Sequence, residues 1–173
     1  MSARRAPAYL AGYPPALVQQ VMTLIEQGRF AGALRARYPD AHTVRSDNAL
    51  YDYVQALKAA HLRSAPPLGK VRFDNTLHVI RNALGTHTAI SRVQGSRLQA
   101  KREIRIATLF RNVPEAFLRM IVVHELAHLR VREHDKAFYQ LCLHMAPDYH
   151  QVEFDLRAYL SYRDAGGEAL WGA

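Results

Sequence analysis

The pentapeptide His124-Glu125-Leu126-Ala127-His128 constrains this chain more than any other feature. Two histidines four residues apart lie one above the other on a helix, so both imidazoles can reach one metal ion. The glutamate between them points about 100° round the helix, where it can touch a water on the metal without ligating the metal. The pattern therefore predicts a helix that carries His124 and His128 as metal ligands, with Glu125 beside them.

The residues around the pentapeptide predict a buried helix. Pro114 suits the first turn of a helix, Glu115 complements its positive end, and no Gly or Pro follows as far as Leu129. Two opposite sides are apolar, one with Phe117, Ile121, His124 and His128, the other with Leu118, Val122, Leu126 and Leu129. A helix that is apolar on both sides is buried. Imidazoles in such a helix are costly unless a metal ion or hydrogen bonds compensate them, so hydrogen-bonded core histidines are the structural alternative.

A catalytic zinc site needs a third protein ligand, and His134 is the first candidate. On a continuous helix His134 would lie about 9 Å beyond His128 and off its face. It can join the site only if the helix ends near residues 130–132 and the chain folds back. Asp135 is suited to cap a following helix, which places His134 in the turn just before that helix. Two residues on one face of the next helical stretch are rival ligands: His150 and Glu153.

Periodicity and turn residues divide the rest of the chain into helices and strands. Helices are expected at 14–27, 29–38, 49–62, 114–130, 135–146 and 149–162, the third capped by Asp47. Strands are expected around 71–73, 77–79, 86–93 and 103–108, the first two joined as a hairpin at Asp74-Asn75. We therefore expect an α+β fold of zincin-like type: a helical N-terminal part, a small mostly antiparallel sheet, and an active-site helix followed by two C-terminal helices. Residues 1–173 are expected to form a single domain, with 1–65 as the helical N-terminal part and 70–163 as the zincin-like core.

Composition favours a cytoplasmic globular protein. Hydrophobic residues make up 49% of the 173 residues, yet no apolar run approaches the length of about 18 that a membrane span requires. Residues 1–7 lack the apolar core of a signal peptide. The single cysteine, Cys142, excludes an internal disulfide and suits a reducing compartment. It lies in a helical pattern beside Leu141 and Leu143, so we interpret it as a packing residue.

The charge is strongly positive, +8 at neutral pH with a pI of about 9.9, which favours polyanions, nucleotides or acidic proteins as partners. Six basic residues stand close together in the sequence with Glu103 as the one acidic residue among them. They are Arg92, Arg97, Lys101, Arg102, Arg105 and Arg111. Two interpretations remain open, a solvated sheet edge on which charge discourages aggregation, or an anion-binding wall beside the metal-bearing helix.

Other polar residues carry weaker signals. Tyr139, Tyr149 and His150 are candidate oxyanion-stabilising residues, although a buried aromatic or a surface imidazole is the favoured interpretation of each. The remaining histidines have no ligand-like spacing and are interpreted as structural or surface residues. They are His42, His61, His78, His87 and His144.

Several segments resemble the YgjP-like family of metal-dependent hydrolases, usually labelled metallopeptidases and related to the WLM and SprT-like zinc proteases. Residues 104–114 and 117–129 are similar to the strand, connecting loop and active-site helix of that family, and residues 134–139 to its third-ligand segment. The similarity extends from Tyr9 to Tyr159.

The resemblance implies specific roles. It makes His124, His128 and His134 zinc ligands and Glu125 the catalytic base. One segment departs from the family pattern: many relatives carry a Trp-Gly-Ser-Cys-Ser-like stretch, where this chain has different residues at 89–97. The departure implies a different substrate for this subgroup.

Three functional hypotheses follow, and the native metal and the oligomeric state stay open in each. The first is a zinc metallopeptidase in which Glu125 takes a proton from the attacking water. The second, which the resemblance brings, is a pyrophosphatase that splits UTP into its monophosphate and diphosphate; the basic run supports it because Arg and Lys stabilise phosphoryl charge. The third is a protein that associates weakly with nucleic acid through its basic surface and holds a structural zinc.

Overall fold

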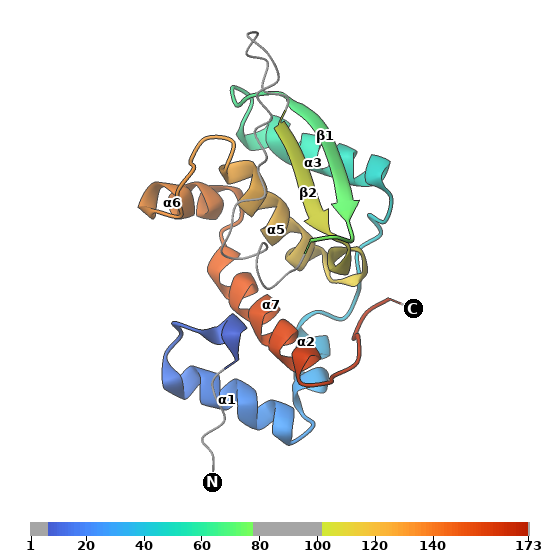
Figure 1. The fold of residues 1–173 in the computed structure, drawn as a ribbon, viewed down its shortest axis with the longest axis vertical. Helices are drawn as coiled ribbons and strands as arrows, with labels where there is room; N and C mark the ends of the chain where they lie inside the picture. The colour runs from blue at the N-terminus through green and yellow to red at the C-terminus, as the bar shows by residue number, and fades with distance from the viewer. Residues whose placement is uncertain (1–6, 78–101, 173) are drawn as a thin grey trace.

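A computed structural model describes residues 7–77 and 102–172 of the chain. In these residues the protein forms six α-helices, two short 3-10 helices and two strands, so the expected α+β class is confirmed (Figure 1). In chain order the elements are η1 (Ala8–Leu10), α1 (Pro15–Glu26), α2 (Phe30–Arg37), α3 (Asp47–His61), β1 (Leu68–Asp74), β2 (Arg102–Ala107), η2 (Thr108–Asn112), α5 (Glu115–Ala127), α6 (Lys136–Met145) and α7 (Tyr149–Asp164).

Local signals explain where the N-terminal helices begin and end. The chain leaves α1 at Gly28 with a φ of +67°, a conformation that glycine adopts without strain. Ser46 caps α3, because its hydroxyl accepts the amide N–H of Ala49 at 3.0 Å. The prediction that Asp47 caps this helix is therefore wrong by one residue. Asp47 lies inside the first turn, where its carboxylate accepts the amide N–H of Phe73 in β1 at 2.9 Å.

The two described strands pair in parallel, with Val71 opposite Ile104 and Phe73 opposite Ile106. All four of these side chains are buried. The period-two pattern thus identified both strands and the apolar face of the sheet correctly.

The expected antiparallel pairing is wrong for the strands that the structure describes. A hairpin at Asp74-Asn75 would have paired β1 with the residues that follow it, whereas β1 pairs with β2. Residues 75–101 stand between the two strands, a connection long enough to return the chain for parallel pairing. Apart from Leu77, which is not in a strand, the strands expected at 77–79 and 86–93 lie outside the described residues.

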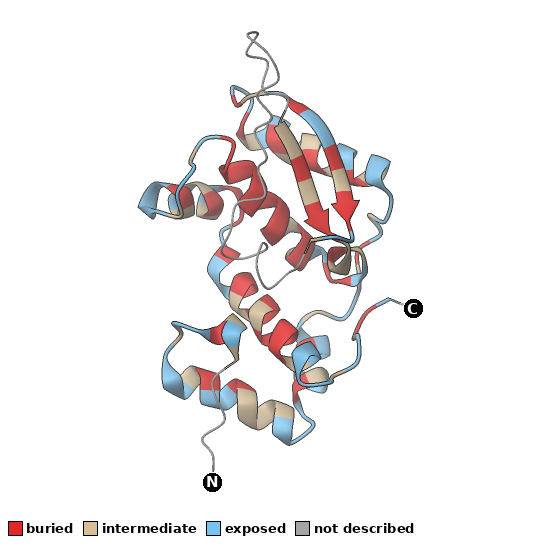
Figure 2. Cartoon of the chain, viewed as in Figure 1, coloured by how far each residue is buried: buried red, intermediate tan, exposed pale blue. Residues whose placement is uncertain are grey.

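The elements are layered around α5. Figure 1 shows α3 running along β1 and α5 running along β2, while α7 extends from α5 toward α1 and α2 at the other end of the molecule. Figure 2 shows that α5 is the most completely buried helix in this view, whereas α1 and α6 keep exposed faces. Among the described helices, none combines the length and apolar character needed to cross a bilayer.

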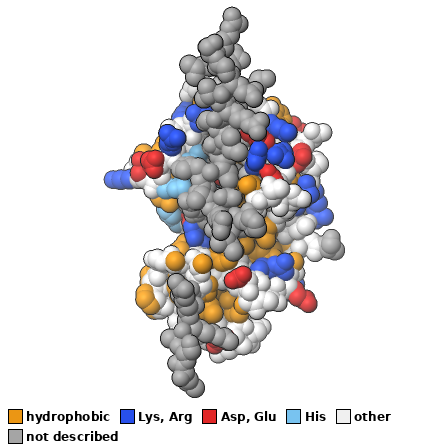
Figure 3. Space-filling view, in the orientation of Figure 1, with side chains coloured by type: hydrophobic (Ala, Val, Ile, Leu, Met, Phe, Trp, Pro, Cys, Tyr) orange, Lys and Arg blue, Asp and Glu red, His pale blue; other side chains and the backbone are white. Residues whose placement is uncertain are grey.

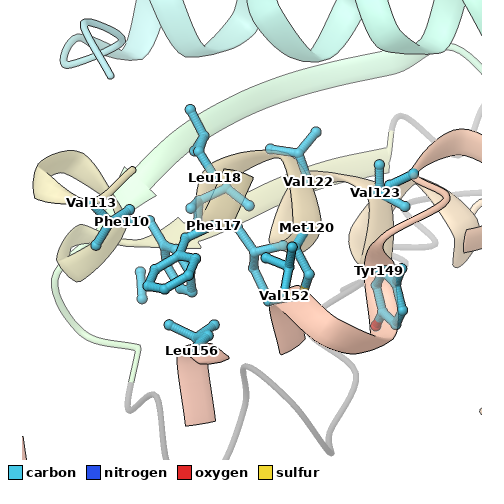
Figure 4. Packing of buried hydrophobic residues seen from close by; sticks show 14 of the residues in the cluster. Phe110, Val113, Phe117, Leu118, Met120, Val122, Val123, Tyr149, Val152 and Leu156 are labelled. Atoms are coloured by element: carbon cyan, nitrogen blue, oxygen red, sulfur yellow. The ribbon is translucent and has the colours of Figure 1, made fainter. Parts of the chain in front are cut away.

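The two apolar sides of α5 pack against different partners. Leu118 and Val122 point toward the strands, whereas Phe117 points toward Leu156 of α7 (Figure 4). Each of these side chains is fully buried, and burial of one such side chain contributes about 1.5–3 kcal/mol. Helix α5 is therefore held on both sides, which fixes the direction in which its polar residues point.

Candidate metal centre

Helix α5 places His124 and His128 on one of its faces, as the four-residue spacing predicted. Both side chains are buried, with 2% and 4% of their surface exposed, and their Nε2 atoms lie 3.3 Å apart. Glu125, between them in the sequence, is also buried, with 4% exposed. Three ionisable side chains thus stand close together at the C-terminal end of a helix whose middle is mostly apolar.

The helix ends earlier than the sequence predicted, at Ala127 rather than near residue 130. His128 is its C-cap, and the amide of Leu129 bonds back to the carbonyl of Leu126 in a tighter turn. No Gly or Pro causes this break. Instead, the guanidinium of Arg102 in β2 donates to the carbonyl oxygens of His128 (3.1 Å) and Leu129 (3.2 Å). These terminal carbonyls have no partner within the helix, so the cation both satisfies them and complements the negative helix end.

The turn returns His134 to the same place. The side chain of Asp135 accepts the amide N–H of Phe138 at 3.0 Å and begins α6, which confirms the predicted cap. His134 directly precedes this cap. Its Nε2 atom lies 3.1 Å from Nε2 of His128 and 3.2 Å from Nε2 of His124. The structure therefore brings together the three histidines that the sequence selected.

The three Nε2 atoms form a nearly equilateral triangle with sides of 3.1–3.3 Å. In a tetrahedral zinc site with Zn–N bonds of about 2.0–2.1 Å, two ligand nitrogens lie about 3.3–3.4 Å apart. Imidazole nitrogens are good ligands for zinc, copper, iron and nickel. Among the described residues, this is the one group of three or more potential ligands close enough to hold an ion. The donor set fits a divalent transition-metal ion.

Hydrogen bonds at the Nδ1 atoms of His124 and His128 fix the orientation of the two rings, so that their Nε2 atoms point toward the centre of the triangle. Nδ1 of His128 lies 3.0 Å from the carbonyl oxygen of Val131, which can only accept, so Nδ1 carries the proton. In the neutral imidazole Nε2 then bears a lone pair. Nδ1 of His124 lies 2.8 Å from the hydroxyl of Tyr149. Metal-ligating histidines commonly bond their second nitrogen in this way.

Phe138 of α6 forms an apolar wall beside the triad. Its ring stacks on His128 with centroids 4.5 Å apart, and it meets His124 and His134 edge-on at 5.0 and 4.9 Å. The ring is fully buried. It shields one side of the site from water, which strengthens electrostatic interactions there.

The rival third ligands lie elsewhere. Glu153 of α7 forms an ion pair with Arg157, with contacts of 3.0 and 3.1 Å, and is absent from the ligand group. His150 is exposed and its ring lies 5.4 Å from that of Tyr139. Tyr149, a candidate oxyanion group, instead contacts the metal-distal nitrogen of His124.

Burial controls the ionisation of the polar groups around this centre. Desolvation, followed by the nearby Glu153 carboxylate, raises the pKa of Tyr149 and of Tyr139, so both phenols stay protonated at neutral pH. Desolvation also raises the pKa of the buried Cys142 thiol to about 12. A thiol that rarely ionises is a packing group and a poor nucleophile.

The described members of the basic run each bind other parts of the protein. Arg102 binds the end of α5, and Arg105 lies within 3.3 Å of Glu103 and 3.6 Å of Asp74. Arg111 lies over the ring of Phe73 at 4.8 Å. Arg92, Arg97 and Lys101 lie outside the described residues. On the face shown in Figure 3, histidine atoms reach the surface beside both basic and acidic side chains.

Sequence reasoning identified only part of the support of the site. It singled out Tyr149 as an oxyanion candidate and Arg102 as part of the basic run, whereas the structure places Tyr149 against Nδ1 of His124 and Arg102 at the end of α5. It missed Phe138, although this residue stands four residues after His134 in the segment that resembles the third-ligand region.

A cluster of three histidines, two buried and one half-buried, that includes the His-Glu-x-x-His spacing on an α+β fold is typical of metal-dependent hydrolases. Comparison with known proteins agrees: the model of the YgjP-like family, described as a metallopeptidase domain, matches residues 73–159. The chain belongs to this family, and it is therefore an enzyme of the hydrolase class. It is 60% identical to the protein named UTP pyrophosphatase from Escherichia coli (strain K12) over 158 residues, which cover 91% of this chain and 95% of that protein. No solved structure matches the chain significantly.

Proposed function

We propose that this protein is a zinc-dependent hydrolase whose metal is held by His124, His128 and His134. The observation that carries the proposal is the triangle of Nε2 atoms at 3.1–3.3 Å, in a site with one apolar wall. Three protein ligands leave a fourth position of a tetrahedral ion for water or substrate, as in catalytic zinc sites. A structural zinc normally has four protein ligands, and the group formed by the described residues has three, which weighs against a structural role.

Glu125 is the proposed general base. When bound, the metal ion supplies a Lewis acid that lowers the pKa of water toward neutrality. The Glu125 carboxylate is buried on the turn of α5 that carries His124 and is not one of the three clustered ligands, which suits a residue that acts on water and not on the metal. It accepts the proton of the attacking water and can return that proton to the leaving group.

The proposed substrate is a nucleoside triphosphate, with UTP as the first to test. Support comes from the 60% identity, over nearly its full length, to a relative named UTP pyrophosphatase. In this reaction the water oxygen bonds to the α-phosphorus as the bond from that phosphorus to the diphosphate breaks, and Glu125 takes the proton. Exposed Arg132 and Lys136 stand two residues either side of His134 and offer cations for the phosphates, partly offset by Glu133.

A peptide is the second candidate substrate. The matching family model is described as a metallopeptidase domain, and the same site would place a peptide carbonyl where the Lewis acid acts. The sequence-based expectation put this activity first, and both the family description and the name of the relative support their respective substrates. We test the nucleotide first because it is the substrate named for a relative that is 60% identical.

Two other sequence-based expectations are kept as proposals. One is a single domain, supported by a hydrophobic cluster that includes residues from Leu10 to Trp171. The other is a cytoplasmic location, supported by the lone, buried Cys142.

The test is to incubate the purified, zinc-loaded protein with UTP, other nucleoside triphosphates and a peptide library, and to measure diphosphate and new amino termini. We expect diphosphate from UTP.

Glu125→Gln should keep its zinc and lose about 10²- to 10⁴-fold of the rate, the usual contribution of a general base. Glu168→Gln, which removes one exposed carboxylate from the C-terminal tail, is the matched control. A fully active Glu125→Gln variant would contradict the proposed mechanism, and peptide cleavage without diphosphate release would transfer the assignment to the second candidate.

A further inference from the structure

Tyr149 is the first residue of α7 and reaches back to the metal centre. The residue is fully buried, and its hydroxyl oxygen lies 2.8 Å from Nδ1 of His124. The two rings are nearly parallel, with an interplanar angle of 16°. The contact is therefore made on the edge of the imidazole opposite the Nε2 atom that faces His128 and His134.

The direction of this hydrogen bond follows from the part that Nε2 of His124 plays. That atom lies 3.3 Å from Nε2 of His128 and 3.2 Å from Nε2 of His134, so as a ligand it must present its lone pair to the shared ion. A neutral imidazole then carries its proton on the other nitrogen, so Nδ1 donates and the oxygen of Tyr149 accepts.

We propose that Tyr149 is a positioning residue for the metal ligand His124: its oxygen accepts the Nδ1 proton and holds Nε2, with its lone pair, toward His128 and His134. The inference rests on the proposed function and extends it beyond the three ligands. Arg157, farther along α7, donates to the backbone oxygen of Tyr9 at 3.0 Å, which ties the N-terminal segment to the helix that carries Tyr149.

The structural reason for such a residue is the position of His124. His124 is buried and its Nε2 atom faces the other two histidines, so a hydrogen bond at Nδ1 fixes the orientation of the ring. His128 achieves the same orientation through a backbone carbonyl, at 3.0 Å from Val131. Tyr149 does for His124 what Val131 does for His128.

The first experiment measures the zinc affinity of the full-length protein by competition with a chelator. Tyr149→Phe keeps the ring and removes only the hydroxyl. We expect it to bind zinc roughly 10- to 100-fold more weakly, the usual effect of losing an outer hydrogen bond of a ligating histidine. Tyr159→Phe is the matched control, because it removes a buried hydroxyl from the same helix, where that group lies 3.5 Å from the amide of Leu170. Its affinity should equal that of the wild type.

The outcomes separate this inference from the proposed function. If the wild type binds no zinc, the proposed function fails. If the wild type binds zinc tightly and folded Tyr149→Phe binds it equally tightly, the positioning role alone is refuted.

A second measurement needs no substitution and covers the case in which the variant does not fold. In metal-free wild type at about pH 8, ¹⁵N chemical shifts report which ring nitrogen of His124 carries a proton. The proposal predicts a proton on Nδ1. A proton on Nε2, with Nδ1 accepting from the tyrosine, would overturn it.

Discussion

Two buried histidines of this chain use their ring nitrogens in opposite ways. In His42, Nε2 lies 2.6 Å from the carbonyl oxygen of Phe110, and Nδ1 accepts the amide N–H of Val44 at 2.9 Å. Both nitrogens therefore serve the backbone, and His42 is a structural residue, as its lack of ligand-like spacing indicated. In His128 only Nδ1 is used by the backbone, and Nε2 faces two other imidazoles. The sequence already distinguished the two histidines, because His128 stands four residues after His124 whereas His42 has no histidine at such a spacing.

The environment of His42 predicts a pH-dependent contribution to stability. Burial, helped by the charge of Arg45, lowers the pKa of His42 below its ordinary value of 6.5, although Phe110 and Glu115 act in the opposite direction. Protonation of Nδ1 of His42 would also place an N–H donor opposite the amide N–H of Val44, which is itself a donor. The folded state therefore favours neutral His42, and its contribution is fully present above pH 6.5 and is lost as the pH falls below that value toward the lowered pKa.

The measurement is the free energy of unfolding of wild type and His42→Gln by denaturant titration between about pH 8 and pH 5. The stability advantage of the wild type over the variant should shrink as the pH falls, because only the wild type carries the titrating group. An advantage that stays constant or grows toward acid would show that His42 is not held neutral. Zinc is kept out of both samples so that titration of the triad affects them equally.

At the scale of elements, the turn between α5 and α6 brings His134 beside His124 and His128, and the proposed metal site depends on that turn. The Asp135 cap fixes the start of α6 directly after His134, and removing a cap of this kind costs about 0.5–2 kcal/mol. Asp135→Ala should therefore lower the free energy of unfolding of the metal-free protein by about 1 kcal/mol. Asp148→Ala is the matched control, since Asp148 occupies the N-cap position of α7 but its side chain makes no cap bond. Its cost should stay within about 0.5 kcal/mol, and equal losses in the two variants would contradict the capping role.

The same turn shows which elements the sequence could predict. Helices α5, α6 and α7, the Asp135 cap and the position of His134 follow from signals within a few residues, and the structure agrees with each. The early end of α5 depends on Arg102, which stands some 25 residues before the carbonyls it binds. The parallel pairing of β1 with β2 likewise depends on a partner distant in the sequence. Periodicity identifies a strand and its buried face, but it carries no information about which strand lies beside it.

At the scale of the whole molecule, α7 links the metal centre to the N-terminal helices. Its first residue, Tyr149, touches His124, and near its other end Tyr162 stacks on Phe30 of α2 with centroids 5.2 Å apart. The C-terminal tail after α7 packs against the same part of the molecule through Trp171. Trp171 packs against Phe117 of α5 and donates its indole N–H to the backbone oxygen of Tyr38 at 2.7 Å.

These long-range contacts have no local signature. Trp171 stands after the last helix in a segment with three glycines and one charged residue, Glu168, and nothing there distinguishes a packed tail from an exposed one. Tyr38 is similar, because its hydroxyl bonds to Asp155 at 2.6 Å across more than a hundred residues. The cluster of three histidines could be predicted because its members are close together in the chain, whereas the packing that supports it could not.

The zinc content of the purified protein tests the central claim most directly. We expect about one zinc per chain in the wild type, and the same in His144→Ala, which removes an exposed histidine from α6. His134→Ala should hold much less, because it removes one corner of the triangle of Nε2 atoms. Wild-type protein that binds no metal under saturating zinc, or a His134→Ala variant that binds it as tightly as the wild type, would contradict the account.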